Sequence, residues 1–417
     1  MFFIAKRIFS GGEAGQASAS AVRVATAGVA IGVLVMIISI CVTIGFQSEI
    51  KDRVASVVGH GQVVNAQGLY RDLPRPIQIT DSMREALALT PGVERVQRFV
   101  LCPGMLKTQD AFRGVMFRGV GTDFDPAFLS SCLKEGTVPS FGSTSVAEGS
   151  AGYPDSILVS ARTASAMNMQ VGQKVYAYFF DTGLRVRRFV VAGIFQTNLA
   201  DYDAQMCYAD SRAVQKIAHW EEDQYSGAEI VLKEYRGLDS VYTSMFHRFS
   251  RRVDDYGQPY AVARVEELFP QIFSWLTLLD TNVVAILILM ICVASVTMVS
   301  GLLIIILERT YFIGVMKAMG ATNRQLRHVF LYLSVMIVAR GVLLGNAVAF
   351  ALLLLQKYTG LVSLDPANYY LDTVPVSFPW MSIVLTNCIV MTVCVLVLIV
   401  PTYVISRIVP ARSIRFE

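Results

Sequence analysis

Residues suited to chemistry are scattered through this sequence rather than grouped. None of its histidines, which are His60, His219, His247 and His328, has a second ligand at the spacing of a zinc site. The chain contains no G-x-x-x-x-G-K-[ST] phosphate loop, no G-x-S-x-G motif and no H-E-x-x-H motif. Its Asp and Glu residues do not single out an acid and a base. The sequence therefore predicts no catalysis by this chain alone, no metal site and no cofactor.

The composition of the chain indicates a membrane protein. Of the 417 residues, 54% are hydrophobic and only 16% are charged, and the mean hydropathy is +0.50. This is too apolar for an ordinary soluble protein. Four stretches exceed the roughly 20 apolar residues that cross a bilayer core, namely 24–46, 276–307, 329–355 and 380–406. The first is predicted to be a retained anchor, because it is longer than the core of a secretory signal and lacks a clear cleavage site.

Basic residues near the span ends predict the orientation of the chain. Lys and Arg are enriched on the cytoplasmic side of membrane proteins. They gather in segments 1–23, 308–328 and 407–417, whereas the loop 356–379 has only one, Lys357. The basic residues of the three segments are Lys6, Arg7, Arg23, Arg309, Lys317, Arg324, Arg327, Arg407, Arg412 and Arg415. Both termini and segment 308–328 are therefore expected in the cytoplasm. The formal net charge of +4 reflects this asymmetry and does not indicate nucleic-acid binding.

The external region, residues 47–275, mixes strand and helix signals. Its two ends, 47–100 and 216–275, each carry a strand, a helix and a strand. The segment between them, 101–215, is rich in short β runs and Gly/Ser turns. The sequence predicts a split α/β subdomain formed by the two ends, with a β-rich subdomain inserted between them. The whole chain is thus a four-span helical membrane protein with a mixed α/β external domain.

The first two spans are predicted to continue as helices outside the membrane. Phe46, Ile50 and Val54 recur at helical spacing after the first span, and residues 265–280 are expected to run as a helix into the second. Two such helices would form a rigid stalk. The alternative is that these ends are interfacial caps.

The stretch "LERTYFIGVMKAMGATNRQLRHVF", residues 307–330, separates two long apolar runs. It predicts a short amphipathic helix with Ile313, Met316 and Lys317 on one side, broken by Gly320 and the alanine after it. Thr322 or Asn323 can cap the helix that enters the third span. A helix in this position either fits a groove in a partner or forms a surface turn that binds nothing, and the residues alone leave both open.

"ERTYFIGVMKAMGAT" resembles the signature E-R-T-x-x-I-G-x-x-K-A-x-G-A of the FtsX/MacB-type ABC-transporter permeases. The resemblance implies a MacB-like external domain and a coupling helix that docks on a separate cytoplasmic ABC ATPase, which binds ATP and Mg²⁺. This chain is then a non-catalytic membrane subunit. The coupling residues that the resemblance implies are Glu308, Arg309, Ile313, Met316, Lys317, Gly320 and Arg324.

Narrower features resemble the lipoprotein-releasing (Lol) permeases of this superfamily. "IGFQSEIKDRV", after the first span, is similar to their N-G-F-x-x-E-L, with Ile44 in place of Asn. "RRFVVAGIFQTNLADYDAQMCYAD" resembles part of their inserted subdomain. This resemblance implies a permease of the bacterial inner membrane that extracts lipoproteins from the outer leaflet for delivery to the outer membrane. Its partners would be the ATPase, a second permease chain in a homo- or heterodimer, and the lipoprotein.

The same resemblance implies a cavity for acyl chains, lined by the first and second spans of two chains. An apolar lining suits this ligand, because each buried CH₂ contributes about 0.8 kcal/mol. The candidate lining residues are Ile37, Ile40, Ile44, Phe46, Leu276, Leu279, Val283 and Ile286. For each of them the alternative is packing on a neighbouring helix or contact with bulk lipid.

One departure concerns the periplasmic lipoprotein chaperone. In the family, the subunit that recruits it carries a long hairpin, whereas "YFFDTGLRVRRF" leaves room only for a tight turn around residues 181–184. The chain is therefore expected to be the non-recruiting subunit or the single permease of a homodimer. Alternative functions are a mechanotransmitting permease that regulates a cell-wall hydrolase, a MacB-like efflux or export permease, and a receptor-like scaffold without an ATPase.

Overall fold

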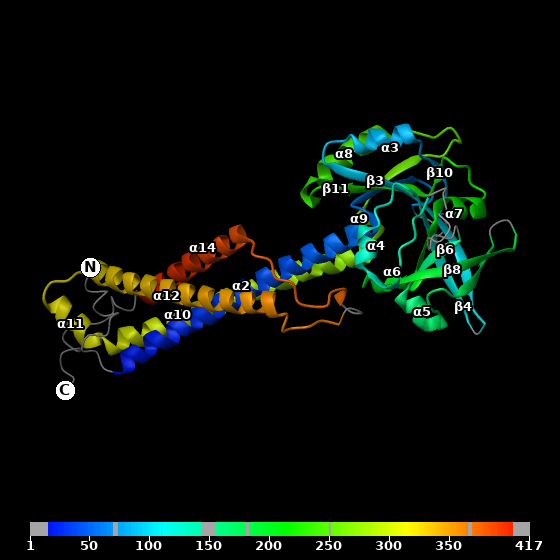
Figure 1. Ribbon diagram of the computed structural model, residues 1–417. Coiled ribbons are helices and arrows are strands. Elements are labelled where there is room, and N and C mark those ends of the chain that lie inside the picture. Colours follow the sequence, from blue (N-terminus) through cyan, green and yellow to red (C-terminus); the bar gives the residue numbers. More distant parts are fainter. Residues whose placement is uncertain are drawn as a thin grey trace. The chain divides into compact units, whose positions relative to one another are not determined.

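The computed structural model describes residues 16–69, 74–109, 111–142, 155–180, 183–249, 252–365 and 369–402 (Figure 1). The chain divides into two compact units. The helical unit comprises Met1–Ser48, Ser274–Ser363 and Thr373–Glu417, and the α/β unit comprises Glu49–Phe273 and Leu364–Asp372. Part of the predicted loop 356–379 thus belongs to the α/β unit. The predicted terminal segments 1–15 and 403–417 lie outside the described residues.

Helices long and apolar enough to cross a membrane coincide with the predicted spans. They are α2 (Gln16–Val58), α10 (Pro270–Glu308), α12 (Asn323–Thr359) and α14 (Trp380–Val397) with α15 (Ile399–Thr402). Half of the most apolar stretch of α2 is buried inside the protein, whereas only 17% of the corresponding stretch of α10 is buried. Helix α2 is therefore the most enclosed of the spans, and α10 leaves most of its apolar surface uncovered.

Glycines let α12 approach α2 closely. A Cβ atom added to Gly341 would lie 2.8 Å from Val29 Cβ, and one added to Gly345 would lie 2.6 Å from the Ala30 carbonyl oxygen. Two small residues one turn apart therefore form the contact, an arrangement common where membrane helices pack closely. On its other side α12 is joined to α14 by reciprocal amide hydrogen bonds of Asn346 and Asn387, of 2.9 and 3.1 Å. In an apolar core such a pair satisfies both side chains.

Prolines interrupt two of the predicted helices. The prediction of a continuous helix over 265–280 is wrong, because α9 (Val265–Leu268) ends before Phe269 and α10 begins at Pro270. Proline disfavours helical geometry in the residue before it and suits the first helical position. The fourth span is interrupted at Leu398, three residues before Pro401, whose ring excludes a regular helical bond to the preceding turn. The predicted helical extension of the first span is confirmed, since α2 continues to Val58.

The two ends of the external region form one antiparallel sheet, as predicted. Its strand order is β12 (Tyr260–Arg264), β1 (Gly61–Asn65), β11 (Gly227–Leu232) and β3 (Val93–Lys107). Helices α3 (Asp81–Ala88) and α8 (Leu238–Phe249) cover one face of it (Figure 1). Short elements complete this part: β2 (Ile77–Gln78), β10 (Gln224–Tyr225) and the 3₁₀ turn Tyr235–Gly237.

The inserted segment forms a closed ring of six strands that shares β3 with the sheet. The ring runs from β3 through β4 (Phe112–Val120), β9 (Met206–Asp210), β6 (Ser156–Ser160), β8 (Arg185–Phe195) and β7 (Lys174–Phe179) back to β3. The remaining elements are α4 (Ala127–Ser131), β5 (Leu133–Gly136), α5 (Ala161–Met167), α6 (Ala200–Gln205) and α7 (Ser211–Ala218). Inward-facing aliphatic and aromatic residues fill the ring. The predicted β-rich character is confirmed.

A buried ion pair ties the ring to the sheet. Arg118 of β4 pairs with Glu229 of β11, and both side chains are 4% exposed. Gln62 donates to the Glu229 carboxylate at 3.2 Å, and Arg118 donates to the Tyr202 hydroxyl at 3.2 Å. Burial raises the pKa of Glu229, and the Arg118 charge opposes that rise. The carboxylate is therefore stabilised chiefly by its guanidinium partner.

His60, the residue directly before β1, adds a pH-dependent contact with β11. The Leu232 amide donates to His60 Nδ1 at 3.2 Å, so that nitrogen must be unprotonated. Burial lowers the pKa of His60 below its usual 6.5, while Asp52 and Glu94 act in the opposite direction. Between the lowered pKa and 6.5 the unfolded chain binds more protons than the folded one.

We expect the α/β unit to lose stability as the pH falls through this window. The melting temperature of the purified chain should drop between neutral pH and about pH 5. A His60→Asn variant offers an oxygen acceptor that does not titrate, so its melting temperature should fall less. Identical pH profiles for the two proteins would contradict this role of His60.

Candidate functional sites

The segment between the second and third spans folds as predicted. Helix α11 (Thr310–Ala318) is followed by Gly320, whose φ of +94° favours glycine. Thr322 then caps α12, because its hydroxyl accepts from the Gln325 amide and the Gln325 side chain accepts from the Thr322 amide. The result is a short cross-helix held between two long ones.

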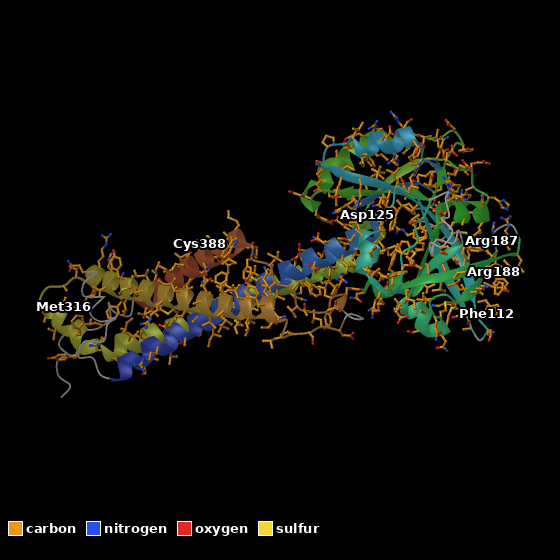
Figure 2. All side chains as sticks on the ribbon, in the orientation of Figure 1. Phe112, Asp125, Arg187, Arg188, Met316 and Cys388 are labelled. Atoms are coloured by element: carbon orange, nitrogen blue, oxygen red, sulfur yellow. The ribbon has the colours of Figure 1, made fainter. Side chains whose placement is uncertain are left out.

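The two faces of α11 have different surroundings. Ile313 is fully buried in the core of the helical unit, and Met316, labelled in Figure 2, packs against the same core. Both side chains attach α11 to its own chain, and Ile313 has no exposed surface for direct contact with a partner, whereas Met316 is only partly buried. Tyr311 is 63% and Met319 72% exposed. The sequence did not point to these large apolar residues, because both occupy unspecified positions of the E-R-T-x-x-I-G-x-x-K-A-x-G-A signature.

The predicted charged coupling residues fall into two groups. Glu308 and Arg324 are exposed. Arg309 and Lys317 are half-buried and have interactions within the chain. The outward face of this segment therefore combines the exposed charges with Tyr311 and Met319, a mixture typical of a protein-binding surface.

The predicted acyl-cavity residues lie on adjacent stretches of α2 and α10. Gln47 links the two helices by donating to Asp280 at 2.8 Å and to the Leu276 carbonyl at 3.1 Å, and Phe46 contacts Trp275 edge-on at 5.5 Å. The buried members of the set are Ile37, Ile40, Phe46 and Leu276, and the others, Ile44, Leu279, Val283 and Ile286, are partly or largely exposed. Only the second group presents substantial surface to a ligand in the single chain.

Sequence reasoning did not single out an exposed apolar surface of the helical unit. It lies on α10 and comprises Leu278, Val284, Ile288, Leu289, Val293 and Val296, each about half exposed or more. No periodicity distinguishes it, because α10 is apolar on all sides. This surface must contact lipid, a second chain or an apolar ligand.

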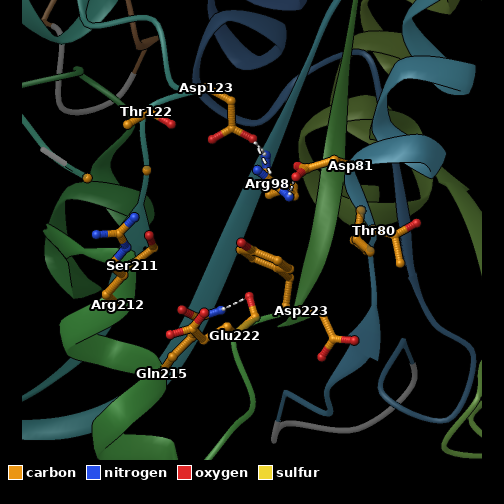
Figure 3. Close-up of a pocket in the computed structure, with 14 residues that line it drawn as sticks. Thr80, Asp81, Arg98, Thr122, Asp123, Ser211, Arg212, Gln215, Glu222 and Asp223 are labelled. Carbon is orange, nitrogen blue, oxygen red and sulfur yellow. Dashed lines mark hydrogen bonds and ion pairs between the residues drawn. The ribbon is translucent and has the colours of Figure 1, made fainter. Parts of the chain in front are cut away.

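A polar cleft of about 440 Å³ lies in the α/β unit, between β3 and α7 (Figure 3). Arg98 donates to Asp123 at 3.0 Å and to Asp81 at 2.8 Å, and its guanidinium lies 4.8 Å from the centre of the Tyr225 ring. The charge of Arg98 is thus neutralised inside the protein. None of the predicted site residues lines this cleft, and its contacts hold α3 and β3 together.

The chain matches the model of the "MacB-like periplasmic core domain" over residues 24–243 and that of the "FtsX-like permease C-terminal" over residues 283–410. The first match covers more than half of the chain. The chain belongs to the FtsX/MacB-type permease family.

Relatives of this permease can be aligned with it over almost its whole length. The "Lipoprotein-releasing system transmembrane protein LolC" of Xylella fastidiosa (strain Temecula1) is 22% identical, with 94% of this chain and 92% of the relative covered. The corresponding LolE of Haemophilus influenzae is 20% identical, with coverages of 99% and 98%. The solved periplasmic region of MacB from Actinobacillus actinomycetemcomitans is 12% identical, covers 52% of this chain and 95% of its own, and has a TM-score of 0.34. The protein is an ABC permease of the Lol/MacB type.

Proposed function

We propose that this permease extracts lipoproteins from the outer leaflet of the bacterial inner membrane, driven by a separate ATPase. The similarity to LolC and LolE over at least 94% of the chain carries this proposal, because it includes both the spans and the external domain. The chain itself performs no catalysis in this scheme. ATP and Mg²⁺ are bound by the ATPase.

Force enters at α11 in the proposed mechanism. This segment faces the cytoplasm, together with both chain termini. The exposed residues Tyr311 of α11, Met319 directly after it and Arg324 at the start of α12 contact the ATPase, while the buried Ile313 fixes α11 to the long helices. When ATP closes the ATPase dimer, the change in its docking surface favours one of two arrangements of the helices.

The substrate occupies a cavity between two permease chains. The exposed apolar residues of α10, together with Leu279, Val283 and Ile286, supply a surface suited to acyl chains. The second chain is either another copy or a related permease. Closing the cavity drives the acyl chains out of the membrane.

We propose that this chain does not recruit the lipoprotein chaperone through a long hairpin. Strands β7 and β8 are joined by residues 180–184, of which 181 and 182 lie outside the described part. A connection of this length leaves no room for a long hairpin. Recruitment then falls to the other chain of a heterodimer, or to a different surface in a homodimer.

Reversing one exposed charge tests the docking site. An Arg324→Glu variant should bind the ATPase at least about tenfold more weakly and lose ATP-driven lipoprotein release, because a like charge opposes the contact. Lys317→Glu should act in the same direction. Arg187→Glu, on the exposed part of β8 in Figure 2, is the matched control.

Co-purification of the permease with the ATPase, followed by lipoprotein release from proteoliposomes, measures both effects. Normal ATPase recovery with Arg324→Glu would refute the docking site. A wild-type complex that activates a cell-wall hydrolase and releases no lipoprotein would favour the mechanotransmitting alternative.

A further inference from the structure

A second large cavity in the α/β unit is an apolar groove that runs along β3. It has a volume of about 610 Å³, within the range of ligand-binding pockets. Its lining includes Leu101, Pro103 and Met105 from β3, together with Pro76, Phe180 and Trp220. It shares none of its lining residues with the polar cleft.

The sheet is interrupted along this groove. On one edge of β3, pairing with β11 ends at Phe99, and pairing with β7 begins only at Met105. Ser226 closes the end of β11, since its amide donates to the Phe99 carbonyl at 3.0 Å and its hydroxyl accepts from the Leu101 amide at 2.7 Å. The residues between, Leu101 to Gly104, have no strand beside them on this edge within the described part of the chain.

The backbone groups at this gap are acceptors. Main-chain groups alternate between the two edges of a strand, so the carbonyls of Leu101 and Pro103 point to the same edge as the Leu101 amide. Neither carbonyl has a backbone donor among the described residues, and the Pro103 carbonyl accepts only a weak hydrogen bond from the Cys102 thiol, at 3.8 Å. Pro103 has no N–H to offer. A ligand that matches this edge therefore brings hydrogen-bond donors about two residues apart, as an extended peptide does and an acyl chain does not.

The side walls match an apolar peptide. Phe180 is 61% exposed, although it follows directly on the buried Phe179 at the end of β7. Trp220 and Pro76 are half-buried and add aromatic and pyrrolidine surface. Among the described residues that line the groove there is no carboxylate, and the one charged side chain is that of Arg75, which donates to the Gln67 side chain at 2.7 Å. Rigid apolar groups around a short open strand edge are the usual arrangement for recognising an extended segment.

We infer that this groove binds an extended, apolar polypeptide segment of the transported lipoprotein through main-chain hydrogen bonds to the carbonyls of Leu101 and Pro103. The inference rests on the proposed function for the identity of the segment. Because Pro103 interrupts the donor pattern, the groove accepts a short segment and does not extend into a long ladder. Binding the polypeptide would let the α/β unit hold the protein part while the acyl chains leave the membrane.

Photo-crosslinking of the full-length permease tests this inference. A benzoylphenylalanine replaces Trp220 in the groove, and in a control protein it replaces Leu89, an 83% exposed residue outside it. Each protein is reconstituted in liposomes with the ATPase. The probes are a triacylated lipoprotein and a synthetic peptide of its N-terminal sequence without lipid. Both probes should crosslink at position 220 about tenfold more than at position 89.

A second substitution tests a different lining residue of the groove. Phe180→Asp places a carboxylate in the groove at an exposed position and should reduce crosslinking at position 220 about tenfold, without changing ATPase binding. The matched change Leu89→Asp should leave that crosslinking intact.

The outcomes separate the groove from the proposed function. Equal crosslinking at positions 220 and 89, or crosslinks that map only to acyl carbons, would overturn the peptide groove, and continued lipoprotein release would leave the proposed function standing. Peptide crosslinking at position 220 in a complex that releases no lipoprotein would support the groove and count against the proposed function.

Discussion

Replacing Arg118 with methionine should destabilise the α/β unit by about 3–5 kcal/mol. The substitution leaves the Glu229 carboxylate 4% exposed with only the Gln62 amide as a described donor. It also removes the donor to Tyr202, whose hydroxyl lies 2.8 Å from that of Tyr208. Since Arg118 lies on the ring and Glu229 on the sheet, we expect the loss to loosen both parts together.

The matched control removes both charges. Arg118→Met combined with Glu229→Met leaves no uncompensated buried charge, so the double variant should regain most of the lost stability. Urea unfolding of the purified full-length protein, followed by proteolysis of the α/β unit, measures the difference. Equal midpoints for Arg118→Met and the wild type would show that this pair does not hold the unit together.

Gly345→Val should disrupt the packing of α12 on α2, at a cost of about 3 kcal/mol. A Cβ at this position would lie 2.6 Å from the Ala30 carbonyl oxygen and 2.9 Å from Val33 Cβ. The first of these atoms belongs to the helix backbone and cannot rotate away. The helices must therefore separate, and the contact at Gly341 one turn away would open with them.

Thermal melting in detergent and the monodisperse yield measure this effect. Leu343→Val is the matched control, because Leu343 lies on the same helix and is 71% exposed. It should melt like the wild type, whereas Gly345→Ala should fall between the control and Gly345→Val. A Gly345→Val protein as stable as the control would mean that the two helices are not in close contact.

Local sequence signals determined most of the helices and strands of this protein. Apolar length predicted the four long helices, and the strand and helix patterns of the two ends of the external region predicted the elements that form the sheet. The cap at Thr322 and the break at Gly320 were predictable from residue type. Pro270 is an equally local signal for a helix break, but the apolar run after it led to the prediction of a continuous helix. These features depend on backbone preference and hydrophobic length, which act over a few residues.

Only the tertiary structure decided which side chains and strand edges are accessible to a partner or ligand. Ile313 looked like a docking residue and is buried, while Tyr311 beside it is exposed. The unpaired edge of β3 exists because β11 and β7, far apart in the sequence, meet the same strand at different places. A helix that is apolar all round, such as α10, has no periodicity to show which side its neighbours cover. Burial and strand pairing are set by contacts between distant residues, so a local pattern cannot specify them.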